Sequence, residues 1–265
     1  MADTPYTTLA REAWNEAAPI HWRQSEALLG AFRRPETSFL TPLHLDELKR
    51  IGLEGATVAQ LNCNNGRETI SMRRAGAAAV TGFDISGAFI DQARRLAEAA
   101  GSDARFVVAD IYEIGAEFDG AFDIVTVTAG ALCFMPDLPG YFRVARRLLK
   151  PGGRLNVYDC HPITDMFELD RDRGDRPLGF VRSYFDRTPQ KHVTGLDYVG
   201  GTTYDAREIY YFHHTLGDIA GACLEAGFTI RRLEETGEDP SQAFPSLERA
   251  AIKPPLSFLL TAERA

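Results

Sequence analysis

The sequence predicts an α/β fold with a mostly parallel sheet, and three observations lead to that prediction. Short apolar runs that end in a polar residue recur up to Asp159, as at 57–62, Ala79–Asp84 and Phe122–Thr128. Segments with helical periodicity separate these runs, and an Asn/Gly turn follows the first of them. Strands that alternate with helices need right-handed crossovers, which place helices on both faces and ligands at the carboxyl ends of the strands.

Two helices are expected before the first strand. Residues 7 to 29 carry Leu9, Ala13 and Ala17 on one side, although Pro19 should break or kink this run. A second helix, 42 to 51, begins with a proline in its first turn and ends before a glycine. We interpret residues 1–52 as an N-terminal helical cap.

The regular alternation stops after the strand Gly153–Asp159 and resumes at Thr215. The intervening segment is too long for an ordinary loop. Its β-branched and aromatic residues predict short antiparallel strands at 181–185, 193–199 and 208–212. We interpret 161–214 as a β-rich substrate cap whose rings shelter a flat or hydrophobic substrate: Phe180, Tyr184, Phe185, Tyr198, Tyr204, Tyr210, Tyr211 and Phe212.

The remaining segments complete the core of the domain. A capping-box match, Thr215 with Asp218, predicts a helix that ends at Gly227, and strands are expected at 228–234 and 255–262. The predicted organisation is therefore the helical cap 1–52, a core 53–160, the substrate cap 161–214 and a closing segment 215–265.

The first strand leads into the candidate ligand site. Val58–Gly66 reads as a strand followed by a tight turn, and a helix is expected from Arg67. The first four N–H groups of a helix are unpaired and the helix dipole favours negative charge there, so this turn can accept a carboxylate or a phosphate. Asp84 follows about twenty residues later, where an acidic side chain accepts ribose hydroxyls.

With these motifs in this order, residues 57–159 resemble a class I S-adenosylmethionine (SAM) dependent methyltransferase of the small-molecule type. Asp110 with Ile111, and the Lys-Pro-Gly-Gly entry at 150–153, are the features that resemble this family in particular. The resemblance implies a Rossmann-like, seven-stranded sheet closed by an antiparallel hairpin. It also implies SAM as the cofactor, with Asp110 holding the adenine amino group.

The first motif departs from the family's pattern of an acidic residue followed by Gly-x-Gly-x-Gly. Gln60, Asn62 and Asn64 stand at three of these positions, and only Gly66 is retained. Asn tolerates left-handed backbone, so the turn can form, but we expect an altered pocket for the methionine end. The expected cofactor-binding residues are Gln60, Asn62, Asn65, Gly66, Asp84, Ile85, Asp110, Ile111 and Thr128.

Three residues are candidates for the chemistry. His161 follows the fifth strand at the ligand-binding edge, and a side chain that titrates near neutrality suits a general base. Hydrogen bonding to the backbone at the adjacent Pro162 is an equal alternative for it. Tyr184 is a candidate for orienting a polar group of the substrate, and Tyr6 for closing over the methionine end. The other five histidines lack such a context.

Composition narrows the class of partner. The net charge of −8 argues against nucleic acid, which needs a concentrated basic surface, and favours a small molecule. The spacing of the four cysteines indicates neither a metal site nor a disulfide framework. No apolar run approaches the roughly 20 residues that span a bilayer. We expect a cytoplasmic protein, with a homo-oligomer possible through the N-terminal helix unless that helix covers its own pocket.

Three functions remain open at this point. The leading hypothesis is methyl transfer from SAM to a small-molecule acceptor, with S-adenosylhomocysteine as the product. The second is cyclisation of SAM to azetidine-2-carboxylate and methylthioadenosine, because a neutral Gln60 would help the amino group lose its proton. The third is a non-catalytic subunit with a SAM fold. An NAD-dependent oxidoreductase ranks below these, for want of a catalytic Tyr/Lys pair.

Overall fold

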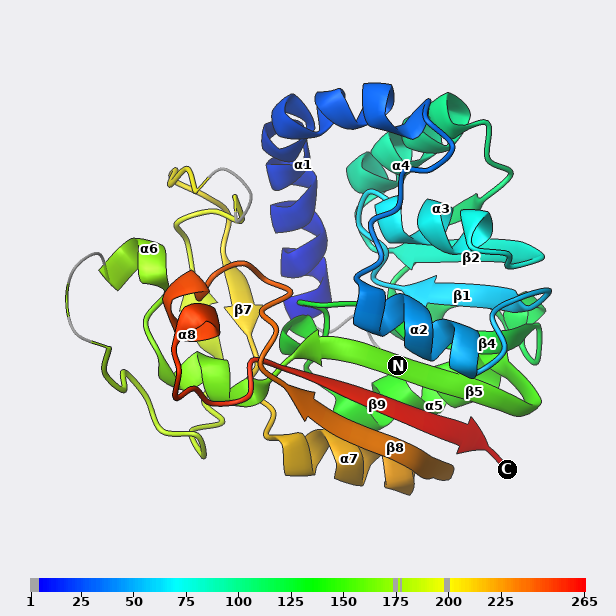
Figure 1. Ribbon diagram of the computed structural model, residues 1–265. Coiled ribbons are helices and arrows are strands. Elements are labelled where there is room, and N and C mark those ends of the chain that lie inside the picture. The colour runs from blue at the N-terminus through cyan, green and yellow to red at the C-terminus, as the bar shows by residue number, and fades with distance from the viewer. Residues whose placement is uncertain (1–4, 174–175, 177, 198–200) are drawn as a thin grey trace.

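The computed structural model describes residues 5–173, 176, 178–197 and 201–265, and a seven-stranded sheet forms its centre (Figure 1). The sheet has the order β3-β2-β1-β4-β5-β9-β8. Its strands are β1 (Thr57–Leu61), β2 (Ala79–Asp84), β3 (Arg105–Val108), β4 (Phe122–Val127), β5 (Leu149–Cys160), β8 (Phe228–Thr236) and β9 (Ser257–Arg264). The pairs among β1 to β5 are parallel, and β9 runs antiparallel between β5 and β8. The predicted fold class and its closing antiparallel hairpin are confirmed.

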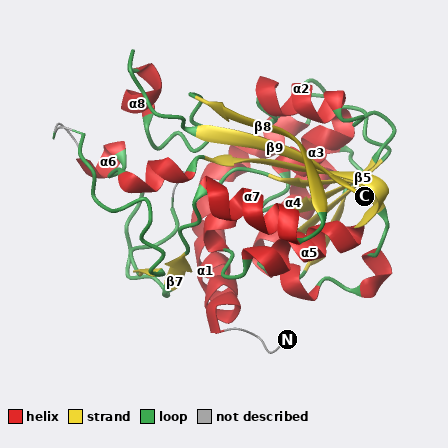
Figure 2. Ribbon diagram, turned by 90° about the horizontal axis from the view of Figure 1, so that it is seen from below, coloured by secondary structure: helices red, strands yellow, loops and turns green. Residues whose placement is uncertain are grey.

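Helices cover both faces of this sheet (Figures 1 and 2). On one face lie α2 (Pro42–Arg50), α3 (Arg67–Arg74) and α4 (Gly87–Ala100), and on the other lie α5 (Leu138–Leu148) and α7 (Leu216–Glu225). Ser86 caps α4 as its position predicts, and the predicted capping box opens α7. The main core lies between the sheet and α5 and α7, where Tyr141 and Phe142 are fully buried.

The first helix, α1 (Pro5–Phe32), stands across the carboxyl ends of the parallel strands (Figure 1). It is one continuous helix with Pro19 inside it, so of the two outcomes expected at this proline, a break or a kink, the break does not occur. Figure 1 shows the helix changing direction partway along its length, as a kink requires. Pro19 is exposed, so the carbonyl that its ring leaves unpaired can be hydrated.

The inserted segment contains less sheet than its sequence suggests. It begins with short helical turns, η4 (Pro162–Met166) and α6 (Asp170–Arg173), and forms one two-stranded ribbon of β6 (Gln190–His192) and β7 (Ile209–Tyr211). The strand expected at 208–212 is confirmed, but 181–185 and 193–197 contain no strand, and residues 198–200, with Tyr198, lie outside the described residues. The prediction of strands from β-branched and aromatic side chains failed here. The strand β6 consists of polar residues and is extended because it pairs with β7.

Four further elements, all short, had no clear signal in the sequence. A short helix, α8 (Pro245–Arg249), lies between β8 and β9, where only a linker was expected. Three-residue 3₁₀ turns, η1 (Ile111–Glu113) and η2 (Ala116–Phe118), replace a longer helix after β3, and η3 (Leu132–Phe134) follows β4. In the described part of the chain, no helix has the length and apolar character to cross a bilayer.

Candidate cofactor and substrate site

The turn after β1 has the backbone conformation that the modified motif requires. Asn62 and Asn64 have φ of 54° and 51°, and Gly66 has φ of 72°. A Cβ at Gly66 would lie 2.3 Å from Cε1 of Phe106 and 2.9 Å from the Cβ of Ala93. Asn is the non-glycine residue that best tolerates left-handed backbone, whereas packing leaves no alternative to glycine at Gly66.

The asparagine side chains of this turn are held by the protein itself. Asn62 Oδ1 accepts a hydrogen bond from the Tyr141 hydroxyl at 2.8 Å, which ties the turn to α5. Asn64 Oδ1 accepts from the Asn65 N–H at 2.8 Å. In the family's usual motif, flexible glycines allow the turn to form. Here the hydrogen bonds of the asparagine side chains stabilise it.

Gln60 is buried between β1, β4 and α3. Its Nε2 donates to Thr128 Oγ1 at 3.0 Å, and its Oε1 accepts from the Thr69 hydroxyl. Both ends of the amide thus have partners within the protein, and Thr128, a predicted cofactor residue, is fixed by the same contact. The neutral side chain of Gln60 therefore links β1 to α3 and to the end of β4.

Asp84, at the carboxyl end of β2, joins the turn to the start of α4. Its Oδ2 accepts from the Asn64 N–H at 2.8 Å, and its Oδ1 accepts from the Ser86 N–H at 2.9 Å. Burial raises the pKa of this carboxyl to about 6, against the opposing effect of these hydrogen bonds. Each carboxylate oxygen retains a second lone pair, so the group can accept ligand hydroxyls as well.

A cavity of about 480 Å³ opens at the carboxyl ends of β2 and β3. Two predicted cofactor residues, Ile85 and Asp110, line it, whereas Ile111 is buried in the main core. Asp110 Oδ1 accepts from the Tyr112 N–H at 3.0 Å and so caps η1. Among the described residues, the lining is Arg11, Phe83, Ile85, Val107, Val108, Ala109, Asp110, Glu113, Ile114, Gly115, Glu117 and Phe118.

A second buried carboxylate shapes the loop after β4. Asp159, at the end of β5, accepts from the Gly130 N–H at 2.5 Å and the Leu132 N–H at 3.1 Å. Burial raises its pKa to about 6. This loop follows Thr128 at the same sheet edge as the cavity, so Asp159 fixes the backbone where a substrate would approach.

The three candidate catalytic residues lie in different surroundings. His161 is buried, with Nδ1 accepting from the Ile163 N–H at 3.1 Å and Nε2 2.8 Å from Glu235 Oε1. Burial lowers the pKa of this imidazole. Because Nδ1 accepts, Nε2 carries the proton that is donated to Glu235. Both ring nitrogens therefore have structural partners, in line with the alternative role in backbone geometry.

Tyr184 belongs to a network that holds the substrate cap. Its hydroxyl accepts from the Leu216 N–H at 3.0 Å, and its carbonyl oxygen is 2.7 Å from Nε2 of His213. Nδ1 of the buried His213 is 2.7 Å from Asp165 Oδ2. This histidine, which has no distinguishing context in the sequence, joins two parts of the cap, while the Tyr184 hydroxyl joins the cap to α7.

Tyr6 lies in an aromatic cluster between α1, η3 and the cap. Its ring centroid is 5.0 Å from that of Tyr210 and 5.1 Å from that of Phe212. On the same side, Phe134 lies 5.1 Å from Trp14 and 4.7 Å from Tyr211. The cap also meets the loop after β4, since the Phe212 N–H donates to the Cys133 carbonyl at 2.7 Å.

The other rings of the insertion are divided between surface and interior. Phe180 and Phe185 are 73% and 72% exposed, so they do not enclose a pocket in this structure. Tyr204 packs against Gly195, and its hydroxyl accepts weakly from the Leu196 N–H at 3.4 Å. Of the predicted aromatic pocket, the segment 210–212 is the part that faces α1 and η3.

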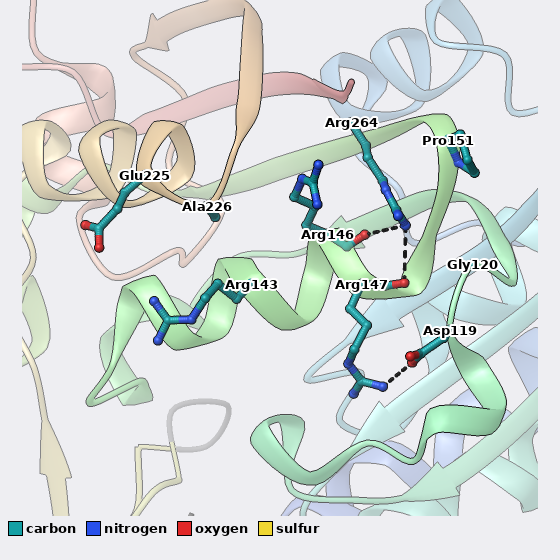
Figure 3. A pocket seen from close by; sticks show the side chains of 9 residues that line it. All are labelled: Asp119, Gly120, Arg143, Arg146, Arg147, Pro151, Glu225, Ala226 and Arg264. Carbon is teal, nitrogen blue, oxygen red and sulfur yellow. Dashed lines mark hydrogen bonds and ion pairs between the residues drawn. The ribbon is translucent and has the colours of Figure 1, made fainter.

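A larger cavity, of about 640 Å³, lies at the opposite edge of the sheet (Figure 3). Four arginines line it, together with the C-terminal ends of α5 and α7. Arg264 donates to the carbonyls of Arg146 and Arg147 at 3.0 and 3.4 Å, and Arg147 pairs with Asp119. Cations at helix C-termini satisfy unpaired carbonyls and complement the dipole, which explains this cluster structurally.

Three residues near the candidate site were not among those predicted for it: Arg11 lines the cavity, Asn15 contacts the start of α4, and Asp159 holds the loop after β4. Arg11 and Asn15 lie four residues apart, on the polar side of a helix whose other side carries Ala13 and Ala17. That spacing shows only that the two share a face. Their approach to the β2–α4 junction depends on how α1 packs, which the local pattern does not reveal.

Comparison with known proteins gives a consistent result. Residues 58–153 match the family model described as a methyltransferase domain. The chain is 28% identical over 221 residues to methyltransferase phqN of Penicillium fellutanum, covering 78% of this chain and 57% of that protein. It is 35% identical over 131 residues to a ubiquinone biosynthesis O-methyltransferase of Xanthomonas oryzae pv. oryzae, covering 49% and 54% respectively. The chain thus spans little more than half the length of these curated relatives.

The solved structures agree on the fold. An S-adenosylmethionine dependent methyltransferase from Mesorhizobium loti superposes with a TM-score of 0.60 at 23% identity, covering 83% of this chain and 96% of that one. The class I methyltransferase fold implied by the sequence motifs is therefore confirmed.

Proposed function

From the match of residues 58–153 to a methyltransferase domain, we propose that this chain is a SAM-dependent methyltransferase that methylates a small-molecule acceptor. SAM supplies a methyl group already activated by a sulfonium. The chain's own task is then to bind the cofactor, align the acceptor and exclude water.

The acidic lining of the cavity at β2 and β3 is the observation that carries this proposal. Asp110, Glu113 and Glu117 surround it with one arginine, and the Asp84 carboxylate lies at the end of the same strand β2. This lining disfavours the pyrophosphate that a dinucleotide would carry next to its nucleoside, whereas SAM carries no phosphate. The charge of the cavity therefore supports SAM over NAD, a distinction that Asp84 alone does not make.

The residues present fit the cofactor. Asp84 would accept the ribose hydroxyls, Asp110 would accept from the adenine amino group, and Ile85 would provide an apolar contact. The turn Asn62–Gly66 would face the methionine end, and Thr128, fixed by Gln60, follows the end of β4. Each of these assignments is part of the proposal.

The acceptor would lie between the loop after β4 and the aromatic cluster of α1, η3 and β7. Ring contacts among Tyr6, Tyr210 and Phe212, and the packing of Trp14 on Phe134, support an apolar or aromatic acceptor. With its nitrogens paired, His161 would position β5 and η4, and an acceptor that ionises readily would need no base from it. Tyr184 would hold the cap closed.

The cyclase alternative gains no support. It depends on a neutral Gln60 beside the amino group of SAM, but the Gln60 amide is engaged with Thr69 and Thr128. The relatives found by sequence comparison are named as methyltransferases. Incubation with SAM alone, read by mass spectrometry, separates the two reactions, since only a cyclase releases methylthioadenosine and azetidine-2-carboxylate without an acceptor.

The compartment of the protein, its lack of a nucleic-acid partner and the role of α1 are also proposals. Four free cysteines, two of them buried, suit a reducing cytoplasm. The net charge of −8 argues against a nucleic-acid partner. Ala13 and Ala17 of α1 are buried against Leu196 and Ile209 of the same chain, which supports the alternative in which this helix covers its own site.

Calorimetric titration followed by turnover assays tests the function. Wild-type protein should bind S-adenosylhomocysteine at one site, and a panel of phenols, amines and apolar carbon acceptors should include one that releases S-adenosylhomocysteine from SAM. Binding without turnover on any acceptor would favour the non-catalytic subunit. Failure to bind either SAM or S-adenosylhomocysteine would contradict the proposal.

A further inference from the structure

Arg11 lines the candidate cofactor cavity although it is remote in sequence from the rest of the lining. The other lining residues all lie within 83–85 and 107–118, whereas Arg11 comes from α1. It is the only cation among them. Its side chain has no hydrogen bond or ion pair with any residue of the described part of the chain. A partly buried guanidinium beside a ligand-sized cavity is thus available to a ligand.

The position of Arg11 is fixed by its neighbours on α1. Asn15 Oδ1 accepts from the Ser86 hydroxyl at 2.8 Å and from the Ala88 N–H at 3.2 Å, at the start of α4. The ring of Trp14 packs edge-on against Phe89 at 5.8 Å. Because Arg11 and Asn15 are one turn apart on the same helix face, this attachment directs Arg11 to the junction of β2 and α4.

Building on the proposed function, we propose that Arg11 contacts the nucleoside half of the cofactor and that α1 forms one wall of the cofactor site. A guanidinium stacks on flat aromatic faces, and adenine presents such a face. The cavity that Arg11 lines is bounded by Ile85 and Asp110, the two residues assigned to adenine. The turn 62–66, assigned to the methionine end, does not line it.

A contact of Arg11 with the nucleoside can be distinguished from a contact with the carboxylate of the cofactor. Arginine also binds carboxylates, and SAM carries one at its methionine end. S-adenosylhomocysteine contains both halves of the cofactor, whereas methylthioadenosine retains the nucleoside and lacks the amino-acid carboxylate. A contact with the nucleoside affects the affinity for both ligands, and a contact with the carboxylate affects only S-adenosylhomocysteine.

The experiment is calorimetric titration of both ligands into the wild type, Arg11→Met, Arg11→Lys and a control, Arg95→Met. Arg95 lies over the ring of Trp22 at 4.0 Å, so its replacement removes the same charge from beside α1 but outside the cavity. We expect Arg11→Met to weaken both ligands about tenfold. Arg11→Lys should fall between Arg11→Met and the wild type, and Arg95→Met should stay within about twofold of the wild type.

Three results would overturn the inference. Unchanged affinity of Arg11→Met for both ligands would show that Arg11 makes no contact with them, and a loss confined to S-adenosylhomocysteine would assign it to the carboxylate. Equal losses in Arg11→Met and Arg95→Met would show only that α1 had loosened. Wild-type protein that binds neither ligand would instead refute the proposed function, and with it this inference. Thermal melting of each variant confirms that it is folded.

Discussion

The two cavities at opposite edges of the sheet are lined mainly by charges of opposite sign. At the carboxyl edge, Asp110, Glu113 and Glu117 line a space of about 480 Å³ with a single arginine. At the amino edge, four arginines line a space of about 640 Å³ where α5 and α7 end. The larger cavity has a structural explanation, because Arg264 donates there to the backbone carbonyls of Arg146 and Arg147.

This contrast shows that cavity size alone does not identify a site in an α/β fold. Helix C-termini gather at the amino edge and attract cations for structural reasons. At the carboxyl edge, the carboxylates of Asp84 and Asp110 at the strand ends can accept hydrogen bonds from a ligand. The charge at the amino edge should therefore affect stability, and the charge at the carboxyl edge should affect cofactor affinity.

The largest effect is expected from the turn of the carboxyl edge. Gly66→Ala would force a Cβ to within 2.3 Å of the Phe106 ring at a φ of 72°. Strain and overpacking together should lower the free energy of unfolding by about 3 kcal/mol. Gly55→Ala is the matched control, since Gly55 has a φ of 74° with open space around it, and it should cost about 1 kcal/mol. Equal costs in urea unfolding would contradict the steric argument.

Asp84→Asn should separate affinity from folding. Loss of a charged acceptor for two ribose hydroxyls should weaken S-adenosylhomocysteine about 100-fold at pH 7.5. Asp103→Asn, at an exposed aspartate that pairs with Arg73 outside the cavity, should leave the affinity unchanged. An Asp84→Asn protein that binds as tightly as the wild type would remove this residue from the site.

The pH dependence of binding should run opposite to that of folding. The pKa of Asp84 is raised from 3.8 to about 6, so its contribution to stability is complete below 3.8 and is lost as the pH rises through 6. Asp159, with a pKa raised to about 6, acts in the same direction. Protonation of Asp84 removes the acceptor, so affinity for S-adenosylhomocysteine should fall about fivefold from pH 6 to pH 5.

Titrations at half-unit steps from pH 7.5 to 5, with unfolding measured in the same buffers, check this prediction. Glu47, Asp123 and Asp218 have pKa values lowered to about 2, so the stability they contribute is lost only as the pH falls below their unfolded values toward 2. In Asp84→Asn the affinity should no longer depend on pH in this range. An unchanged slope in that variant would show that another group is responsible.

The smallest effect is expected at the amino edge. Arg264→Met removes donors to the carbonyls of Arg146 and Arg147. The free energy of unfolding should fall by about 1 to 2 kcal/mol, with no change in affinity for S-adenosylhomocysteine. If the fully folded variant bound S-adenosylhomocysteine more weakly than the wild type, the two edges would not be independent.

The core of the fold could be predicted because its signals are local. The strand ends at Asp84 and Asp110 follow short apolar runs, and Ser86 and Thr215 cap helices within a few residues. No strand forms at 181–185 or 193–197, because a strand such as β6 exists only through its partner. The sequence left a break or a kink at Pro19 open, and the helix continues past this exposed proline. These features depend on packing.

Some residues of the candidate site could likewise be predicted from the local sequence, and others depend on packing. Ile85 and Asp110 were predicted from motif spacing and line the cavity, but Arg11 reaches it through the packing of α1 on α4. His161 stood out by its position after the fifth strand, yet its nitrogens meet Glu235 and the backbone. A position along a strand shows which edge a residue occupies. It does not show which way its side chain is held.

A crystal structure of the chain with S-adenosylhomocysteine tests the central claim most directly. We predict the nucleoside in the cavity at the ends of β2 and β3, with its ribose at Asp84 and its adenine between Ile85, Asp110 and Arg11. Electron density for the ligand in the arginine-lined cavity at the opposite edge, or none at saturating concentration, would contradict the assignment of the two edges.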